Sequence, residues 1–326
     1  MPVKSERAWA WHKRLNRLGP FVGLAFVSLG FAIARPATFA AWNNVEIMLL
    51  QTAVVGTAAL GMTLVIVSGG IDLSVGSTIA LCTVVVALLI RAGAPPAAAA
   101  LGGIAAGSLC GALNGLLITR LRLAPFIVTL GMWGALRGLA KGLASEQMVL
   151  ARATWLNGLL TSLTGGQRWM LFPPGVWIMI GLGVFTAGLL RYTRLGNHIF
   201  AVGSNELTAR LCGVRVERTK LLVYVMGSSF AGVAGVLQFS YLTMGDPTTA
   251  LGAELDVIAA VVIGGGSLAG GEGSVPGSLV GALIMTVVGN GCTKLGLANW
   301  IQEIVTGGII ILAVALDRLR HRRRER

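Results

Sequence analysis

Long apolar segments separated by short basic blocks dominate this chain of 326 residues. Hydrophobic residues make up 55% of the sequence and charged residues only 12%, whereas soluble domains carry about 25% charged residues. No apolar core of this size needs so little charge if water is the solvent, so most of the surface must face lipid. The sequence therefore predicts an all-α integral membrane protein, a polytopic bundle of about ten transmembrane helices.

Several of the ten apolar runs are shorter than the ~20 residues that a full crossing needs. We therefore expect some helices to be short, tilted, broken or re-entrant. No small-residue cleavage site follows the first run, which predicts a retained helix and no signal peptide. The expected organisation is a basic N-terminal tail at 1–19, a transmembrane domain at 20–316 and a basic C-terminal tail at 317–326. The apolar runs cover residues 20–34, 45–67, 73–90, 97–118, 124–143, 176–190, 221–243, 255–266, 275–293 and 299–316.

The positive charges predict how the chain is threaded. With ten spans both termini share a side, and 19 of the 26 Lys and Arg residues fall on that side, against five on the other. Because Lys and Arg are concentrated in cytoplasmic loops, both termini are expected in the cytoplasm. Arg137 and Lys141 lie within the fifth run. Lys141 can extend to the headgroups, whereas Arg137 is expected to face the bundle interior, where an acid could pair with it.

Glycine, with 46 residues, recurs at four-residue spacing in several runs. Lipid gives helices no hydrophobic reason to associate, so close contact between small residues must hold them together. We expect tight helix packing to explain most of these glycines, and flexibility needed for transport to explain some of the rest. The stripes are Gly103, Gly107, Gly111 and Gly115; Gly134, Gly138 and Gly142; Gly227, Ala231 and Gly235; and Gly277 and Gly281.

Two glycine clusters interrupt apolar sequence, GGIDLSVGS at 69–77 and GGGSLAGGEGSVPGS at 264–278. Each glycine costs a helix about 1 kcal/mol, so the helices are expected to break there. Asp72 and Ser74 could cap the helix that follows, and Ser274 with Pro276 resembles a second helix start. Such breaks can mark a transport pathway, but short cytoplasmic turns are the favoured interpretation. The candidate pathway residues are Gly69, Gly70, Asp72, Ser74, Glu254, Asp256, Gly265 and Gly266.

Three acids lie near the eighth run, where charge at bilayer depth is costly and usually functional. Asp246 precedes Pro247 and is typical of a turn. Glu254 and Asp256 lie closer to the membrane, and the sequence leaves open whether they cap a helix or face a cavity.

Residues 191–220 form the only substantial polar segment on the predicted cytoplasmic side. Ser204 followed by Glu206 predicts a helix start, and the letters LTARLC predict a short helix ended by Gly213. An amphipathic helix here could lie on the membrane or dock into the groove of a soluble partner. From these residues alone, an ordinary basic loop is the favoured interpretation.

The motif search excludes several functions. The sequence contains no Gly-Lys-Ser/Thr, hence no P-loop, and the chain is not expected to be its own ATPase or any other enzyme. The four cysteines show no disulfide or metal spacing, and no cofactor or metal is expected on this chain. The net charge is +13. The basic residues flank apolar segments and are not interleaved with aromatic residues, which favours anionic lipid headgroups over nucleic acid as partner.

Four long strings together identify a family resemblance. They are GMTLVIVSGGIDLSVGS (61–77), NGLLITRLRLAPFIVTLGM (114–132), AVGSNELTARLCGV (201–214) and ELDVIAAVVIGGGSLAGGEGSVPGSLVGA (254–282). In this order they strongly resemble the permease subunits of bacterial ABC importers for monosaccharides, of the ribose/xylose/arabinose type.

The resemblance implies a multi-pass permease of the bacterial inner membrane that works with three partners. These are a second permease, identical or homologous, a periplasmic sugar-binding protein, and a separate subunit that binds ATP and Mg²⁺. It also implies that 201–214 is the segment that couples to the ATPase, with Glu206, Ala209, Arg210 and Gly213 as candidate residues. The external stretch 144–175, with Trp155 and Trp169, could contact the binding protein. A permease for branched-chain amino acids or nucleosides, and an ion-coupled secondary transporter, remain the alternatives.

Overall fold

The computed structural model describes residues 3–163 and 169–322, and most of them are helical. Each of the ten predicted runs lies in one helix, and most bounds agree within a few residues, which confirms the predicted helical bundle. The exceptions are the first helix, which begins at Val3, and the last, which ends at Arg322. The elements in chain order are α1 (Val3–Ala34), α2 (Pro36–Phe39), α3 (Trp42–Val67), α4 (Val75–Arg91), α5 (Pro96–Arg120), α6 (Pro125–Leu143), β1 (Val149–Leu150), the 3₁₀ helix η1 (Trp155–Leu160), α7 (Pro174–Tyr192), α8 (Arg194–Ser204), α9 (Glu206–Leu211), α10 (Val216–Leu242), β2 (Met244–Gly245), α11 (Ala253–Ile263), α12 (Val275–Lys294) and α13 (Asn299–Arg322).

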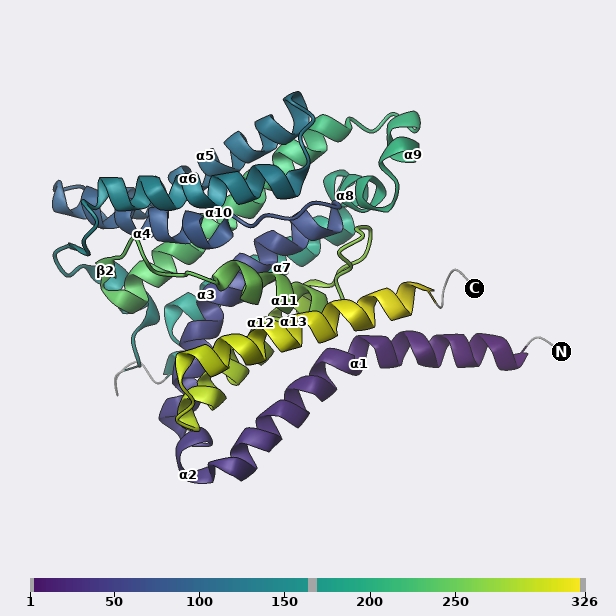
Figure 1. Cartoon of the computed structure of the whole chain (residues 1–326), viewed down its shortest axis with the longest axis horizontal. Helices are drawn as coiled ribbons and strands as arrows, with labels where there is room; N and C mark the ends of the chain where they lie inside the picture. Colours follow the sequence, from purple (N-terminus) through teal and green to yellow (C-terminus); the bar gives the residue numbers. More distant parts are fainter. Residues whose placement is uncertain (1–2, 164–168, 323–326) are drawn as a thin grey trace.

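Within the described part of the chain, five helices are each long and apolar enough to cross a bilayer, namely α3, α5, α7, α10 and α12. Three shorter apolar stretches accompany them, in α1, α4 and α13. Helix α1 begins at Val3 and continues through Pro20 to Ala34, so it includes most of residues 1–19 together with the first apolar run. Proline removes one backbone donor from a helix and bends it, and α1 is bent in Figure 1.

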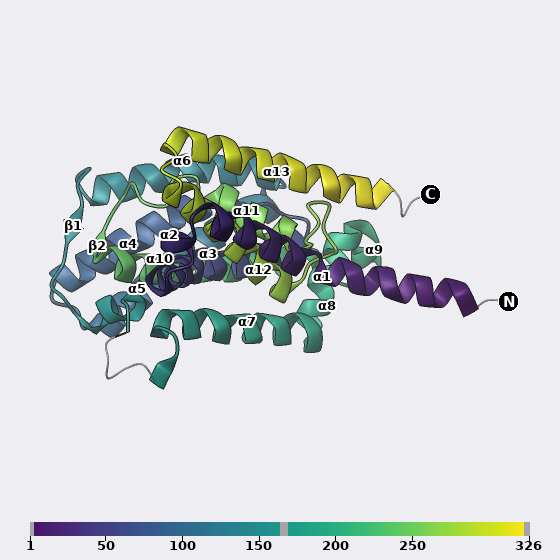
Figure 2. The same ribbon diagram turned by 90° about the horizontal axis from the view of Figure 1, so that it is seen from below.

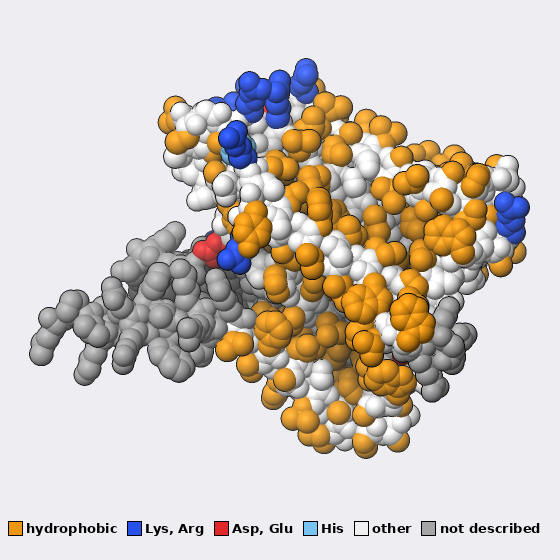
Figure 3. Space-filling view, turned by 180° about the vertical axis from the view of Figure 1, so that it is seen from behind, with side chains coloured by type: hydrophobic (Ala, Val, Ile, Leu, Met, Phe, Trp, Pro, Cys, Tyr) orange, Lys and Arg blue, Asp and Glu red, His pale blue; other side chains and the backbone are white. Residues whose placement is uncertain are grey.

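The two ends of the bundle differ in what they carry. Figure 1 shows that α1 begins and α13 ends at the end that also holds α8 and α9, whereas α2 and the paired strands lie at the other end. We call these the basic end and the outer end. Figure 3 shows Lys and Arg gathered along the edge of the molecule above a wide hydrophobic area. The positive-inside rule places the basic end in the cytoplasm, as the sequence predicted.

The central helices repeat one arrangement in opposite orientations (Figure 1). The long helix α3 runs towards the basic end, the chain turns back, and the shorter α4 runs to the outer end. The long helix α10 runs towards the outer end, the chain turns back, and the shorter α11 runs to the basic end. The packing of the helices follows the same relation. Helix α5 packs on α10, and its counterpart α12 packs on α3. Likewise α4 packs on α6, and its counterpart α11 packs on α13. Inverted repeats with broken helices are typical of transport pathways.

Glycines hold the centre of the bundle together, as predicted for the α5 stripe. A side chain on Gly107 or Gly111 would meet the backbone of α10, and one on Gly61 would meet Gly227. The same prediction is wrong within this chain for the α6 stripe. There, an added Cβ on Gly134, Gly138 or Gly142 would have nothing within 4 Å among the described residues.

The flanks and the outer end complete the molecule. Figure 2 shows α7 along one flank and α6 and α13 along the opposite flank. At the outer end β1 pairs antiparallel with β2, with Val149 opposite Gly245. Trp155 and Trp169 in the outer segment are 59% and 80% exposed.

Candidate functional site

The N-terminal turns of the two short helices α4 and α11 lie against each other inside the bundle. A Cβ on Gly76, in the first turn of α4, would collide with the Glu254 carboxylate and with the carbonyl of Ala250. Only glycine allows this approach. The positive end of a helix favours a negative charge, so the Glu254 carboxylate is stabilised where it lies.

Glu254 and Arg137 bring opposite charges into the interior, with side chains 9% and 7% exposed. Glu254 Oε1 accepts from Trp133 Nε1 at 3.1 Å, and its Oε2 has no partner among the described residues. Arg137 donates to the carbonyls of Pro247 at 3.0 Å and Thr249 at 2.6 Å. The expectation that an acid pairs with Arg137 is therefore wrong in this structure. The turn before α11 instead provides two backbone carbonyls that accept no hydrogen bond within a helix.

Asp72 lies buried where the chain turns back before α4. Its Oδ1 accepts from the backbone nitrogen of Ser74 at 2.9 Å and from its hydroxyl at 2.6 Å. Asn114 donates to that same hydroxyl at 2.9 Å. Asp72 thus fixes the N-cap residue Ser74, but neither side chain caps an N–H of α4. The Ser74 hydroxyl is engaged by Asp72 and Asn114 instead. Ser74 is 0% exposed, so a simple surface turn does not describe this half of the glycine cluster.

The two glycine-rich clusters meet at the basic end and share a contact with α8. Gly271 donates its backbone N–H to the Val67 carbonyl at 2.9 Å. A Cβ on Gly203, in α8, would collide with that carbonyl and with Gly271. Gly69 and Gly270 adopt positive φ angles of 80° and 86°. We call these four residues, Gly69, Gly203, Gly270 and Gly271, the glycine junction.

The second cluster otherwise forms the turn between α11 and α12. Gly265 has a φ of 92°, and Gly266 packs against Val261. The helix start predicted at Ser274 is confirmed, since its hydroxyl accepts from Gly277 N at 3.3 Å and Pro276 lies in the first turn.

The predicted polar segment contains two helices, of which only α9 was predicted. The residue that caps α9 is Asn205, whose side chain accepts from Thr208 N at 2.8 Å; the predicted cap Ser204 is instead the last residue of α8. A capping signal for α8 was available in Thr193, which accepts from Gly196 N at 3.1 Å.

Ion pairs fix α9 against the start of α10. Glu206 pairs with Arg210 at 3.5 Å and with Lys220 at 2.5 Å, and Arg210 pairs with Glu217 at 2.7 Å. These side chains are largely exposed, so each pair contributes little alone, and the connected set orients the helix. Ala209 is buried in a small apolar cluster beneath α9, and Gly213, with a φ of 84°, allows the turn into α10.

Two leucines of α9 were not identified from the sequence. Leu207 and Leu211 are 69% and 81% exposed, and their spacing of four residues places them on one face of the helix. An exposed apolar pair at the basic end, on a helix held in place by ion pairs, is typical of a surface that docks into a groove.

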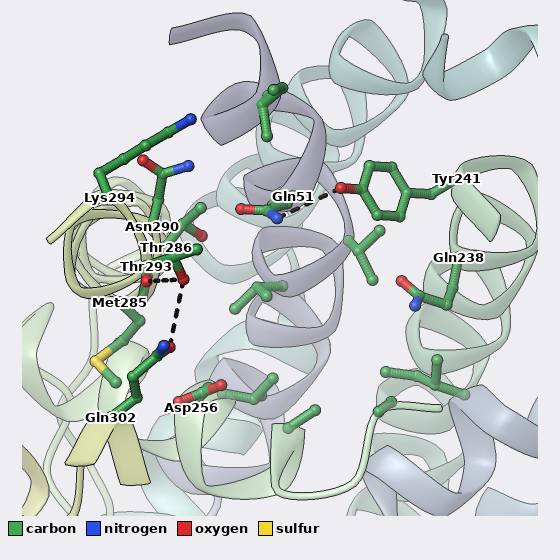
Figure 4. A pocket seen from close by; sticks show the side chains of 18 residues that line it. Gln51, Gln238, Tyr241, Asp256, Met285, Thr286, Asn290, Thr293, Lys294 and Gln302 are labelled. Carbon is green, nitrogen blue, oxygen red and sulfur yellow. Dashed lines mark hydrogen bonds between the residues drawn. The ribbon is translucent and has the colours of Figure 1, made fainter. Parts of the chain in front are cut away.

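The acid Asp256 points away from Glu254 into a cavity of about 520 Å³ between α3, α10, α11, α12 and α13. Figure 4 shows this side chain among amide and hydroxyl groups of the surrounding helices. The sequence left open whether these two acids cap a helix or face a cavity. In the structure Glu254 lies against the start of α4, whereas Asp256 faces the cavity. Asp246 is the expected turn acid and accepts from Thr248 N at 2.7 Å.

Cys82, Cys110 and Cys292 are buried, whereas Cys212, directly after α9, is exposed. Among the described residues, no group of His, Cys, Asp and Glu could hold a metal ion.

Comparison with known proteins places this arrangement in context. A family model described as "Branched-chain amino acid transport system / permease component" matches residues 44–314. The chain is 41% identical over 277 residues to the ribose import permease protein RbsC of Escherichia coli K12, covering 84% of this chain and 85% of that protein. It is 36% identical to RbsC of Bacillus subtilis 168, over 97% and 99% of the two chains. It is 37% identical to the L-arabinose permease AraH of Azospirillum brasilense, over 98% and 92%. No solved structure matches it.

Proposed function

The chain belongs to the family of branched-chain amino acid transport system permease components, and we propose that it is the permease subunit of an ATP-driven monosaccharide importer. The relatives support a sugar over the alternatives, because several of them are named for the transport of ribose, arabinose, fructose or allose. The family description itself names branched-chain amino acids, which is the second candidate substrate. The chain forms the membrane pathway, and a separate subunit hydrolyses ATP with bound Mg²⁺.

The observation that carries the coupling proposal is the exposed face of α9 formed by Leu207 and Leu211. In our proposal this face docks into a groove of the ATPase subunit on the cytoplasmic side. Closure of the ATPase then moves α8 and α9 as one unit. Because Gly203 of α8 contacts Val67 and Gly271, the motion reaches both glycine-rich turns. Through them it reaches α4, which follows the first turn, and α11, which precedes the second. The permease thereby alternates between inward-facing and outward-facing states.

Two further partners complete the importer. The α6 glycines, which have open space above them in this chain, lie on the flank where we place the second permease. Gly307 and Gly308 of α13, on the same flank, have equally open surroundings. The sugar-binding protein is placed at the outer end, near Trp155 and Trp169, from where it delivers substrate. The complex lies in the bacterial inner membrane.

The exposed cysteine next to α9 provides a test on the native chain. Cys212 is exposed and the other three cysteines are buried, so maleimide labelling reports the surroundings of α9. We expect the partner ATPase subunit to slow labelling of Cys212 in the wild type and to lose this effect with L207D/L211D. The control is Asn197→Asp, which adds a negative charge at an exposed position of α8. Equal labelling with and without the ATPase would show that α9 is not the docking helix.

A further inference from the structure

A second pocket lies at the basic end, between the last turn of α5 and the first turns of α10. Both helices are long and apolar enough to span a bilayer. The volume of the pocket, about 420 Å³, falls within the range of about 300–1,000 Å³ for small-molecule sites. The lining consists of Leu116, Thr119 and Arg120 of α5, Arg215 directly before α10, and Glu217, Arg218 and Leu221 of α10.

Three arginines give this pocket a positive charge. Arg120 is the last residue of α5, and Arg215 and Arg218 lie at the start of α10. None of the three forms an ion pair with a described residue. The one acid of the lining, Glu217, pairs with Arg210 of α9 at 2.7 Å, so its charge is already compensated. Because guanidinium groups bind phosphate oxygens through paired N–H donors, the pocket is suited to a phosphate group.

An apolar strip on α5 leads directly to these arginines. Leu109, Leu113 and Leu116 are 63%, 43% and 41% exposed. Together with Arg120 they follow one another at intervals of four, three and four residues, which places them on one face of the helix. The second permease is placed at α6 and α13, so this face of α5 is open to the acyl chains of the lipid. A phosphate that carries acyl chains therefore matches both the arginines and the strip, whereas a soluble phosphate matches the arginines alone.

Close packing of the two helices fixes the walls of the pocket. A Cβ on Gly115 would collide with the side chain of Leu221, so α5 and α10 touch one turn away from the arginines. The Thr119 hydroxyl donates to the Gly115 carbonyl at 2.7 Å and is thereby held against its own helix. A site between two helices that already pack together needs little ordering when a ligand binds.

We propose that this pocket binds the phosphate of an anionic glycerophospholipid of the cytoplasmic leaflet, with the acyl chains along Leu109, Leu113 and Leu116. Basic pockets between transmembrane helices on the cytoplasmic side suit such headgroups. A zwitterionic lipid is a weaker ligand, because the cation of its headgroup meets the same arginines. Since Glu217 lines the pocket and pairs with Arg210, the bound phosphate also lies beside the contact that orients α9.

Native mass spectrometry of the purified full-length chain in detergent tests the site, because it counts bound lipids and measures the affinity of each. The ligands are dioleoylphosphatidylglycerol, dioleoylphosphatidylcholine and glycerol phosphate, which has the phosphate and no acyl chains. We expect phosphatidylglycerol to bind at one site about tenfold more tightly than phosphatidylcholine. Glycerol phosphate should not bind at the same concentrations.

The double variant R120Q/R218Q removes two arginines of the pocket. The matched control R191Q/R194Q removes two exposed arginines at the junction of α7 and α8, outside the pocket. We expect R120Q/R218Q to bind phosphatidylglycerol about thirtyfold more weakly than the wild type, and the control to differ from the wild type by less than about twofold. Thermal unfolding of both variants in lipid-free detergent should match the wild type and shows that they are folded.

Several results would overturn the lipid site. Equal losses of affinity in the two double variants would mean that overall charge, and not this pocket, attracts the lipid. Equal affinity for phosphatidylcholine would remove the selectivity, and equal affinity for glycerol phosphate would make the pocket a site for a soluble phosphate. Unchanged lipid binding by R120Q/R218Q would exclude the pocket, and a simultaneous loss of the ATPase protection of Cys212 would assign its arginines to the ATPase contact. Lipid binding is measured without solute, so the proposed transport function is tested separately.

Discussion

Arg137 and Glu254 are two buried, oppositely charged side chains that no ion pair joins among the described residues. Arg137 instead holds the carbonyls of Pro247 and Thr249, and so fixes the turn from which α11 begins. The sequence predicted that Arg137 faces inwards, because a charge within an apolar run must find a polar partner. It could not predict which partner, because the carbonyls become available only where two distant segments fold back into the bundle.

Replacing Arg137 tests its anchoring role. The Arg137→Met variant loses two hydrogen bonds from a charged donor, so we expect the free energy of unfolding in detergent to fall by about 3 kcal/mol. Lys141→Met is the control, because Lys141 is one turn away and exposed. Thermal unfolding of the purified variants would show the difference, and equal stability of both would mean that Arg137 does not hold the turn.

At the scale of helices, the apolar runs predicted the membrane helices. The glycine spacing did not correctly predict what every helix face contacts. The α5 and α6 stripes have the same spacing, yet only the α5 glycines contact another helix of this chain. Spacing identifies a smooth face and cannot say whether its partner belongs to the same chain. Short polar helices are harder still, since α8 lacks the apolar length of a span and its cap Thr193 follows directly on α7.

The two stripes should respond differently to the same substitution. Gly107→Val collides with the α10 backbone, so we expect this variant to be strongly destabilised or not to accumulate. At Gly138 an added Cβ has no described atom of its own chain within 4 Å. Gly138→Val should keep the thermal stability of the isolated subunit and weaken its association with the second permease. Size-exclusion chromatography with light scattering measures this association, and an unchanged assembly state would place the second permease elsewhere.

The ion pairs of α9 should matter for coupling more than for folding. In E206Q/R210Q the pairs to Lys220 and Glu217 are lost, and because these pairs are largely exposed the fold should lose less than about 1 kcal/mol. The orientation of Leu207 and Leu211 is no longer fixed, so ATP hydrolysis should continue while uptake falls. Normal uptake at normal ATP cost in the double variant would remove the ion pairs from the coupling mechanism.

For the whole molecule, charge and hydropathy predicted the class, the spans and the threading, because these follow from the bilayer as a solvent. The sequence did not predict that α4 and α11 meet with Gly76 against Glu254, since this contact joins residues from the two halves of the chain. Nor did it predict a cavity, which depends on how five helices diverge. The inverted arrangement of the two halves accounts for the contact and the cavity, because it brings the turn before α4 and the turn before α11 into the interior of one bundle.

The most direct test of the central claim is uptake by purified chain in proteoliposomes, with and without the ATPase subunit and the sugar-binding protein. The account predicts accumulation of a monosaccharide against its gradient only when both partners and ATP with Mg²⁺ are present, and none with the L207D/L211D variant. Uphill accumulation by the chain alone, driven by a proton or sodium gradient, would contradict it.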